Sequence, residues 1–183
     1  MSKVIAGMTM SLDGFVNDSN GSVDSLYSDF ETYQNTEPYK NAIQNTGAVV
    51  MGKNTFEMAE DPDWYIDYEF QVPIFVLTHV IPDKQPKATE KVSFTFVVDG
   101  VESAIKQAKL AAGIKDVAVI GGASVTRQCI RARLVDELQI DIMPILLGGG
   151  LRLFEDSETA SIQLERLNVV NLPSGRTHLK FRV

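Results

Sequence analysis

The sequence predicts an α/β fold with three layers: a mostly parallel central sheet, helices that flank it, and an antiparallel C-terminal hairpin. Short apolar runs alternate with segments of helical periodicity, and this alternation is typical of a parallel sheet covered on both faces. Near the C-terminus, two strand-like segments flank a turn at residues 172–175, which is the pattern of a hairpin. The chain has 183 residues, and a domain has roughly 100–200, so we expect a single domain over residues 1–183.

The first elements are a strand, a loop and an interrupted helix. Residues 3–11 are apolar and small, and predict a buried strand that Leu12-Asp13-Gly14 ends. Residues 17–28 are rich in Asn, Asp, Ser and Gly and predict a loop. Residues 30–46 predict a helical region, which we expect to be interrupted before Pro38 because proline disfavours a helical residue ahead of it.

Three further strands follow in the middle of the chain. The glycine-bounded run at 47–52 predicts a buried strand, and residues 53–60 predict a short helix after it. Residues 72–78 are rich in Val, Ile and Phe, and residues 92–98 alternate in hydrophobicity, so each segment predicts a strand.

The last third repeats the alternation of helices and strands. Apolar residues of the segment 101–112 fall on one helical face, and Gly113 is expected to end that helix. The remaining predicted elements are strands at 116–120 and 134–142, a helix at 123–132, and hairpin strands at 164–171 and 177–183.

The composition excludes several classes of protein. Hydrophobic residues make up 44% of the chain and charged residues 22%, as in globular proteins rather than disordered ones. The one cysteine, Cys129, cannot form a disulfide framework and fits a reducing compartment. The sequence has no apolar run of about 18 residues and no signal-peptide pattern at residues 1–8. We therefore expect a cytoplasmic protein that does not enter a membrane.

The charge argues against nucleic-acid binding. The formal net charge is −7, and an acidic surface is repelled by the phosphate backbone unless basic residues cluster on one face. The basic residues form only small groups, so we expect a small-molecule substrate and no nucleic acid.

The first candidate site is the turn Gly121-Gly122, which joins a predicted strand directly to a helix. The first backbone N–H groups of a helix have no partner inside it, and together with the helix dipole they favour a phosphate. Glycine lets an anion approach the backbone, and Ser124 and Thr126 add hydroxyl donors. The alternative is a close-packed turn that binds no ligand, because two glycines alone are a weak signal.

The second candidate is the next such turn, where Gly52 ends a strand and Lys53, Asn54 and Thr55 begin a helix. A cation, an amide and a hydroxyl at a helix N-terminus suit a phosphate. The alternative is an ordinary cap, in which Asn54 or Thr55 satisfies backbone donors. Two such sites at one sheet would suit a dinucleotide, which has more than one phosphate position.

The third candidate is the pair Thr78 and His79 at the end of another predicted strand. These side chains could meet the 2′-phosphate of NADP, and Lys53 would complement it, whereas a protein specific for NAD would place an acid near the ribose. The alternative is that Thr78 merely ends the strand and His79 is solvated.

These segments, in this order, resemble the dihydrofolate reductase superfamily, and specifically the C-terminal reductase domain of the bifunctional riboflavin-biosynthesis deaminase–reductase. The resemblance spans nearly the whole chain. It rests on residues 8–16 (MTMSLDGFV), 51–57 (MGKNTFE), 119–123 (VIGGA), 134–138 (LVDEL) with Pro144, and 148–154 (GGGLRLF).

The family implies an NADPH-dependent reductase that is often dimeric, so we expect NADPH as the cofactor and a homodimer. Carried over by position, Thr9 and Val16 would line the nicotinamide. The phosphate-binding residues would be Gly52, Lys53, Asn54 and Thr55 on the adenosine side, Thr78 and His79 near the 2′-phosphate, and Gly121, Gly122, Ala123, Ser124, Val125 and Thr126 at the pyrophosphate.

Two acids are the catalytic candidates that the resemblance implies, and no metal is expected. Asp13 would sit in the loop at the substrate mouth, where it would help to bind or protonate the substrate. Folate reductases place a carboxylate on the helix after that loop. The matching position lies near Thr36 and Glu37, and Glu37 is the candidate, although an acid on a helix surface is commonly just solvated.

The resemblance implies reduction of a pteridine- or pyrimidine-type heterocycle, as in 5-amino-6-(5-phosphoribosylamino)uracil reductase. The alternatives are a dihydrofolate reductase and a non-catalytic nucleotide-binding oligomeric protein with the same fold. Deamination is not expected, because two histidines and one cysteine cannot build the zinc site of the deaminase.

Four other residues are noted, and two of them have two interpretations. Trp64 and Tyr65 would line a pocket opening or anchor a surface loop, and Arg152 is the candidate for binding a substrate phosphate. Cys129 lies on an apolar helix face and is expected to be an inert buried thiol.

Overall fold

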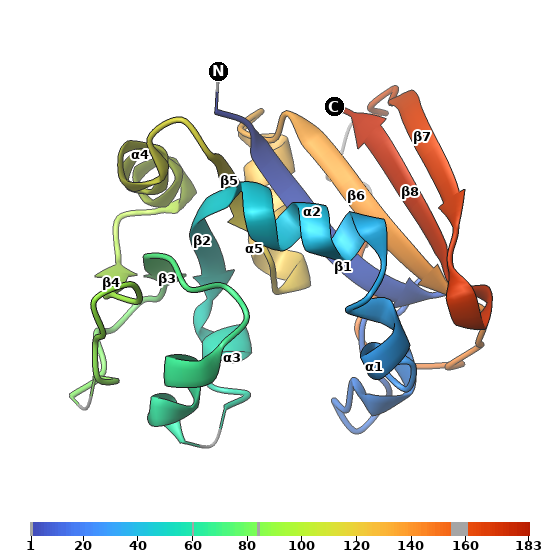
Figure 1. Ribbon diagram of the computed structural model, residues 1–183, viewed down its shortest axis with the longest axis horizontal. Coiled ribbons are helices and arrows are strands. Elements are labelled where there is room, and N and C mark those ends of the chain that lie inside the picture. The colour runs from blue at the N-terminus through green and yellow to red at the C-terminus, as the bar shows by residue number, and fades with distance from the viewer. Residues whose placement is uncertain (1, 60, 84, 155–160) are drawn as a thin grey trace.

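A single eight-stranded sheet organises the computed structural model, which describes residues 2–59, 61–83, 85–154 and 161–183 (Figure 1). The strand order is β4-β3-β2-β5-β1-β6-β8-β7. The strands are β1 (Val4–Ser11), β2 (Thr46–Gly52), β3 (Ile74–Leu77), β4 (Phe94–Val97), β5 (Asp116–Val119), β6 (Glu137–Met143), β7 (Glu165–Asn171) and β8 (Thr177–Arg182).

The sheet is parallel from β4 to β6 and antiparallel at β8 and β7. Strand β8 pairs with β6, and β7 forms the edge beyond it. The predicted three-layer fold with a mostly parallel sheet and a C-terminal hairpin is therefore confirmed.

Five α-helices and three short 3₁₀-helices connect the described strands. The α-helices are α1 (Phe30–Tyr33), α2 (Glu37–Asn45), α3 (Lys53–Phe56), α4 (Val101–Ala112) and α5 (Ala123–Arg131), and the 3₁₀-helices are η1 (Asp24–Leu26), η2 (Pro62–Asp67) and η3 (Pro173–Gly175). Gly113 follows α4 with a φ of 62°, a left-handed conformation that glycine adopts readily at a helix end. The predicted interruption before Pro38 separates α1 from α2, because Thr36 is extended.

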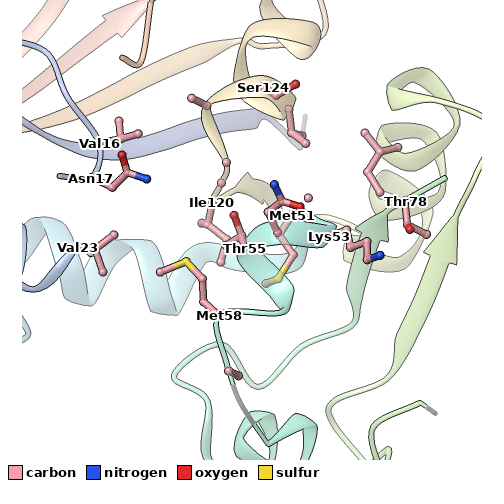
Figure 2. A pocket seen from close by; sticks show the side chains of 18 of the residues that line it. Val16, Asn17, Val23, Met51, Lys53, Thr55, Met58, Thr78, Ile120 and Ser124 are labelled. Carbon is pink, nitrogen blue, oxygen red and sulfur yellow. The ribbon is translucent and has the colours of Figure 1, made fainter. Parts of the chain in front are cut away.

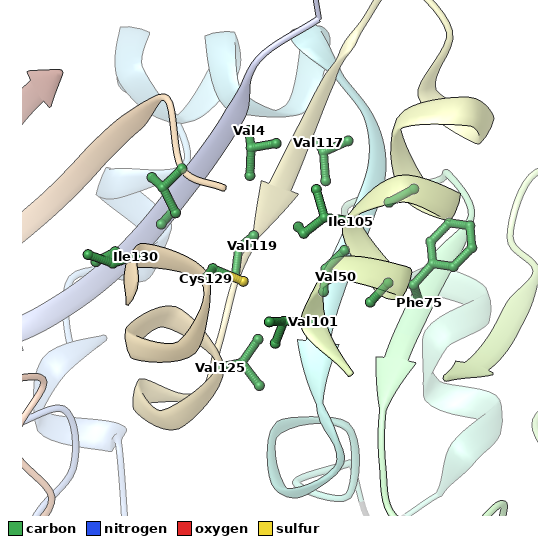
Figure 3. Close-up of a cluster of buried hydrophobic side chains, with 14 of the residues drawn as sticks. Val4, Val50, Phe75, Val101, Ile105, Val117, Val119, Val125, Cys129 and Ile130 are labelled. Atoms are coloured by element: carbon green, nitrogen blue, oxygen red, sulfur yellow. The ribbon is translucent and has the colours of Figure 1, made fainter. Parts of the chain in front are cut away.

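The two faces of the sheet bury two apolar clusters. Along β2, Val50 faces the cluster under α4 and α5, where Ile105 and Cys129 are also buried (Figure 3). Its neighbour Val49 faces the opposite cluster, to which α3 and η2 contribute Phe56 and others. The alternation follows from the strand period of two, and both layers are apolar as the sequence predicts.

Two differences from the sequence-based expectations concern the segment after β2. The helix expected over residues 53–60 ends at Phe56, after one turn. The sequence predicted no element at Pro62–Asp67, where Asp61 accepts a hydrogen bond from the backbone N–H of Asp63 at 3.0 Å and caps η2.

The carboxyl ends of the parallel strands lie on the same side of the sheet, where Gly52 at the end of β2 pairs with Leu77 at the end of β3. In sheets of this kind, ligands bind outside the carboxyl ends of the strands. Within the described ranges, no helix combines the length and apolar character needed to cross a bilayer.

Candidate functional site

A groove of about 1320 Å³ lies at the carboxyl ends of the parallel strands. Ligand pockets commonly measure about 300–1,000 Å³, so this groove has room for a large ligand together with a second, smaller one. Its lining residues come from β1, the loop before η1, the β2–α3 turn, η2, the end of β3 and the β5–α5 turn.

The two predicted glycine turns meet at the groove, which both of them line. The backbone N–H of Gly52 donates to the carbonyl of Gly121 at 2.9 Å. A Cβ at Gly121 would lie 2.9 Å from Oγ1 of Thr55, and a Cβ at Gly52 would lie 3.0 Å from Cγ2 of Val125. Because these approaches leave no space for a side chain, glycine at both positions allows the two turns to meet.

Helix α5 presents its N-terminus to the groove. Its N-cap is Gly122, which has no side chain to cap the first N–H groups, and the first turn carries no acid. Ala123, Ser124 and Val125 line the groove, so their backbone donors are placed where an anion would lie. Thr126 does not line the groove: its side chain is fully buried, and the hydroxyl has no hydrogen-bond partner among the described residues.

The opposite phosphate-binding candidates lie on the wall formed by α3 and the end of β3. Lys53, Asn54, Thr55, Thr78 and His79 all line the groove, and Figure 2 shows Lys53 beside Thr78. Lys53 forms an exposed pair with Glu57 at 3.5 Å, and such pairs are weak. The hydroxyl of Thr78 donates to the carbonyl of Val80 at 2.8 Å, so Lys53 and His79 remain as the charged candidates for a 2′-phosphate.

Thr9 and Val16 line another part of the groove, across from that wall. Figure 2 shows Val16 and Asn17 on the side away from Lys53 and Thr78. Thr9 is buried, and its hydroxyl accepts a hydrogen bond from Nη1 of Arg176 at 3.2 Å. The structure thus brings all the predicted cofactor-binding residues except Thr126 to one groove.

The two predicted catalytic acids lie elsewhere. The Asp13 carboxylate accepts hydrogen bonds from the Ser11 hydroxyl at 2.6 Å and from the backbone N–H groups of Leu147 at 3.1 Å and Gly148 at 2.8 Å. The Ser11 hydroxyl and then these two N–H groups hold the pKa of Asp13 at about 2. Glu37 is exposed on α2 and accepts from Nδ2 of Asn41 at 3.1 Å. Neither acid lines the groove, so we give neither a proton-donor role.

A group of aromatic side chains that the sequence did not predict as a unit lines part of the groove, and we call it the aromatic chamber. Its walls are Tyr27, Met58, Trp64, Tyr65 and Tyr68, with Asp61 at the rim. The Trp64 ring lies 5.3 Å from both Tyr65 and Tyr68. The two residues had been expected either to line a pocket opening or to anchor a surface loop. Trp64 lines the groove, and Tyr65 is buried as an anchor.

A buried polar network lies behind Thr9 and the chamber. Arg176 is fully buried and pairs with Asp29 at 2.6 Å, while its guanidinium carbon lies 4.2 Å from the ring centroid of Tyr33. Burial lowers the pKa of Arg176, but the Asp29 hydrogen bond and the nearby Asp141 carboxylate outweigh it and raise that pKa above its ordinary value. The sequence did not predict this pair, because an arginine beside a turn, as Arg176 is after η3, is ordinarily solvated.

Asp141 completes the network. It accepts from the Tyr33 hydroxyl at 2.6 Å and pairs with Nδ1 of His178 at 2.9 Å. Burial and Asp141 together raise the pKa of Tyr33, so this phenol stays protonated.

Arg152, the predicted ligand of a substrate phosphate, does not line the groove. Its guanidinium carbon lies 4.3 Å from the ring centroid of Phe15, and Nη1 donates to the carbonyl of Asp13 at 2.9 Å. The expectation that it faces the substrate is therefore wrong for this structure, because the side chain is used to hold the loop.

Comparisons with known proteins agree with this fold. The protein is 26% identical to the uncharacterized protein YyaP of Bacillus subtilis (strain 168), with 94% of this chain and 90% of YyaP covered. A protein from Shewanella sp. PV-4, which is named as a riboflavin biosynthesis protein, superposes on this chain with a TM-score of 0.79. The two sequences are 24% identical, and the superposition covers 98% of each chain.

Two more distant structures share the fold. The deaminase/5-amino-6-(5-phosphoribosylamino)uracil reductase of Thermotoga maritima gives a TM-score of 0.72 at 15% identity, covering 99% of this chain and 56% of that one. A dihydrofolate reductase from Enterococcus faecalis, solved with NADP(H), gives 0.61 at 18% identity, covering 98% and 95%. The sequence model of the RibD C-terminal domain matches residues 2–177. Because this match covers nearly the whole chain, the protein belongs to the RibD C-terminal domain family.

Proposed function

We propose that this protein is an NADPH-dependent reductase of a small pteridine- or pyrimidine-type heterocycle. The observation that carries the proposal is the meeting of the two glycine turns, with the Gly52 N–H bonded to the Gly121 carbonyl, at the rim of one large groove. A dinucleotide needs several anion-binding positions within one site, and these turns supply them.

The residues present fit NADPH. The N-terminal turn of α5 would hold the pyrophosphate with backbone N–H groups, and Ser124 would add a hydroxyl. Lys53 and His79 would meet the 2′-phosphate, which favours NADPH over NADH because NADH lacks that group. Thr9 and Val16 would place the nicotinamide against the aromatic chamber.

When bound, NADPH supplies a hydride to a C=N or C=O bond of the substrate. The protein's part is to place the two reacting carbons together and to exclude water. The Tyr27 hydroxyl lies beside Thr9, and burial raises its pKa. This hydroxyl therefore stays protonated at neutral pH and would be able to donate a hydrogen bond to a substrate in the groove.

The test uses Trp64 as a built-in probe, because the chain has one tryptophan and its side chain lines the groove. We expect NADPH to quench the fluorescence of Trp64 and to raise the unfolding temperature, with NADH at least tenfold weaker. Consumption of NADPH would then be followed with dihydrofolate and with 5-amino-6-(5-phosphoribosylamino)uracil side by side. No quenching and no thermal shift with NADPH would refute the proposal.

A further inference from the structure

We infer that the aromatic chamber takes a planar heterocycle that carries no phosphate group. The inference rests on the proposed function in one respect, because it takes the chamber to be the substrate-binding part of the groove that would hold NADPH. Its evidence is separate, because it comes from the charge and shape of the chamber walls and not from the glycine turns.

The chamber walls suit a flat, apolar ring. Tyr65 is fixed in place: its ring stacks on Phe56 with centroids 5.0 Å apart, and its hydroxyl donates to the Phe56 carbonyl at 3.0 Å. Trp64 meets Tyr65 edge to face and is 55% exposed, so its indole is available to cover a ligand. Aromatic side chains favour such stacked and edge-to-face contacts with another ring.

The walls of the chamber, as far as the described residues go, include no cationic side chain. Among the described residues that line the groove, only Lys53 and His79 can be cationic, and both belong to the wall assigned to the cofactor. Figure 2 shows the Met58 side chain directed toward Val23, on the side away from Lys53. The charged residue at the rim of the chamber is Asp61, an acid, so a phosphate entering here would meet a carboxylate. Lys87 lies outside the groove lining and is paired with Asp63, next to Trp64 in the chain, at 2.7 Å.

The arginines near this end of the molecule already have other partners. Arg176 is fully buried and neutralised by Asp29, and Arg152 is held against Phe15. Nη1 of Arg127 donates to the carbonyl of Arg152 at 3.0 Å and that of Leu153 at 3.2 Å. None of the three lines the groove.

Proteins recognise phosphate with Arg, Lys or backbone N–H clusters, and a buried charge without such partners is costly. A neutral ring therefore fits the chamber better than a phosphorylated one.

The test compares pairs of compounds that differ only in a phosphate. The first pair is 5-amino-6-(5-phosphoribosylamino)uracil and its dephosphorylated riboside, and the second is uridine 5′-monophosphate and uridine. Calorimetric titration of the purified protein, with and without saturating NADPH, measures each affinity. We expect the unphosphorylated member of at least one pair to bind tenfold or more tightly than its partner.

A charge variant supplies the converse test. Met58→Arg adds a cation to the chamber without touching the Asp61 cap of η2, and should strengthen binding of the phosphorylated member at least tenfold relative to its partner. Ile66→Arg is the matched control, because Ile66 is on η2 but does not line the groove, and it should leave the ratio unchanged.

The outcomes separate this inference from the proposed function. Preference of the wild-type protein for the phosphorylated members would overturn the inference, and so would failure of every compound to bind while NADPH binds. If the wild-type protein binds the heterocycles but not NADPH, the proposed function is overturned. A measured preference for the unphosphorylated compounds would then still support the inference about the chamber.

Discussion

Asp13 holds two loops together outside the lining of the groove. Its carboxylate joins the end of β1, through Ser11, to the backbone of Leu147 and Gly148. A carboxylate that accepts several hydrogen bonds stays ionised to low pH, and the pKa of about 2 reflects this. A side chain so firmly ionised has no proton to give at neutral pH, and its contribution is to the shape of the groove.

We expect Asp13→Asn to destabilise the protein in a pH-dependent way. The folded state lowers the pKa of Asp13 from 3.8 to about 2, so its stabilisation is complete above the unfolded pKa and is lost as the pH falls through the folded one. The difference in urea midpoint between wild type and variant should be constant from about pH 5 to 8 and shrink below about pH 4.

Asp99→Asn, a change at an exposed carboxylate before α4, is the control and should show no such dependence. A wild-type advantage that grows on acidification would contradict the assignment of Asp13.

Helix α5 is the element on which the proposed cofactor binding would depend most. Ser124→Asp places a carboxylate in its first turn, where the pyrophosphate is expected. The variant should bind NADPH at least tenfold more weakly. It should remain as stable as the wild type or gain up to about 1 kcal/mol, because an acid there interacts favourably with the helix dipole.

Ser124→Asn has nearly the same size as Ser124→Asp without its charge, and should stay within about threefold of the wild-type dissociation constant for NADPH. Trp64 quenching measures both variants. Equal affinity of Ser124→Asp and the wild type would show that the α5 N-terminus does not hold the phosphates.

At the scale of elements, the sequence predicted the helices and turns that leave a pattern in neighbouring residues. The apolar face of α4 and the glycine after it gave the bounds of that helix, and the strand–glycine–helix pattern identified both turns. The segment Pro62–Asp67 was missed because a single 3₁₀ turn has no hydrophobic periodicity to detect. With that turn, the sequence also missed the arrangement of Trp64 and Tyr68 as chamber walls.

Across the whole molecule, the Arg176–Asp29 pair ties the C-terminal hairpin to the loop before α1. The two residues are 147 positions apart. Such a contact leaves no local pattern in the sequence, so neither partner was predicted for the other. The same limit explains why Arg152 was assigned to the substrate: its glycine-rich neighbours were visible, and its contact with Phe15 was not.

We expect Asp29→Asn to cost about 3–5 kcal/mol of unfolding free energy, because it leaves the Arg176 charge buried without its partner. For a chain of this size that loss lowers the unfolding temperature by about 6–20 °C. Urea and thermal unfolding measure it.

Glu165→Gln, which removes an acid paired with Arg182 at the exposed edge of the sheet, is the control and should cost no more than about 1 kcal/mol. Equal effects of the two substitutions would show that burial of the Asp29 pair does not matter.

The position of β1 has a consequence for synthesis on the ribosome. This strand lies between β5 and β6, and β5 begins 105 residues after β1 ends, since 116 − 11 = 105. At about 5–20 residues per second, the nascent chain carries β1 with the backbone groups of both edges unpaired for roughly 5–20 seconds. The emerging polypeptide is therefore exposed to chaperones, and to aggregation, until most of it has been translated.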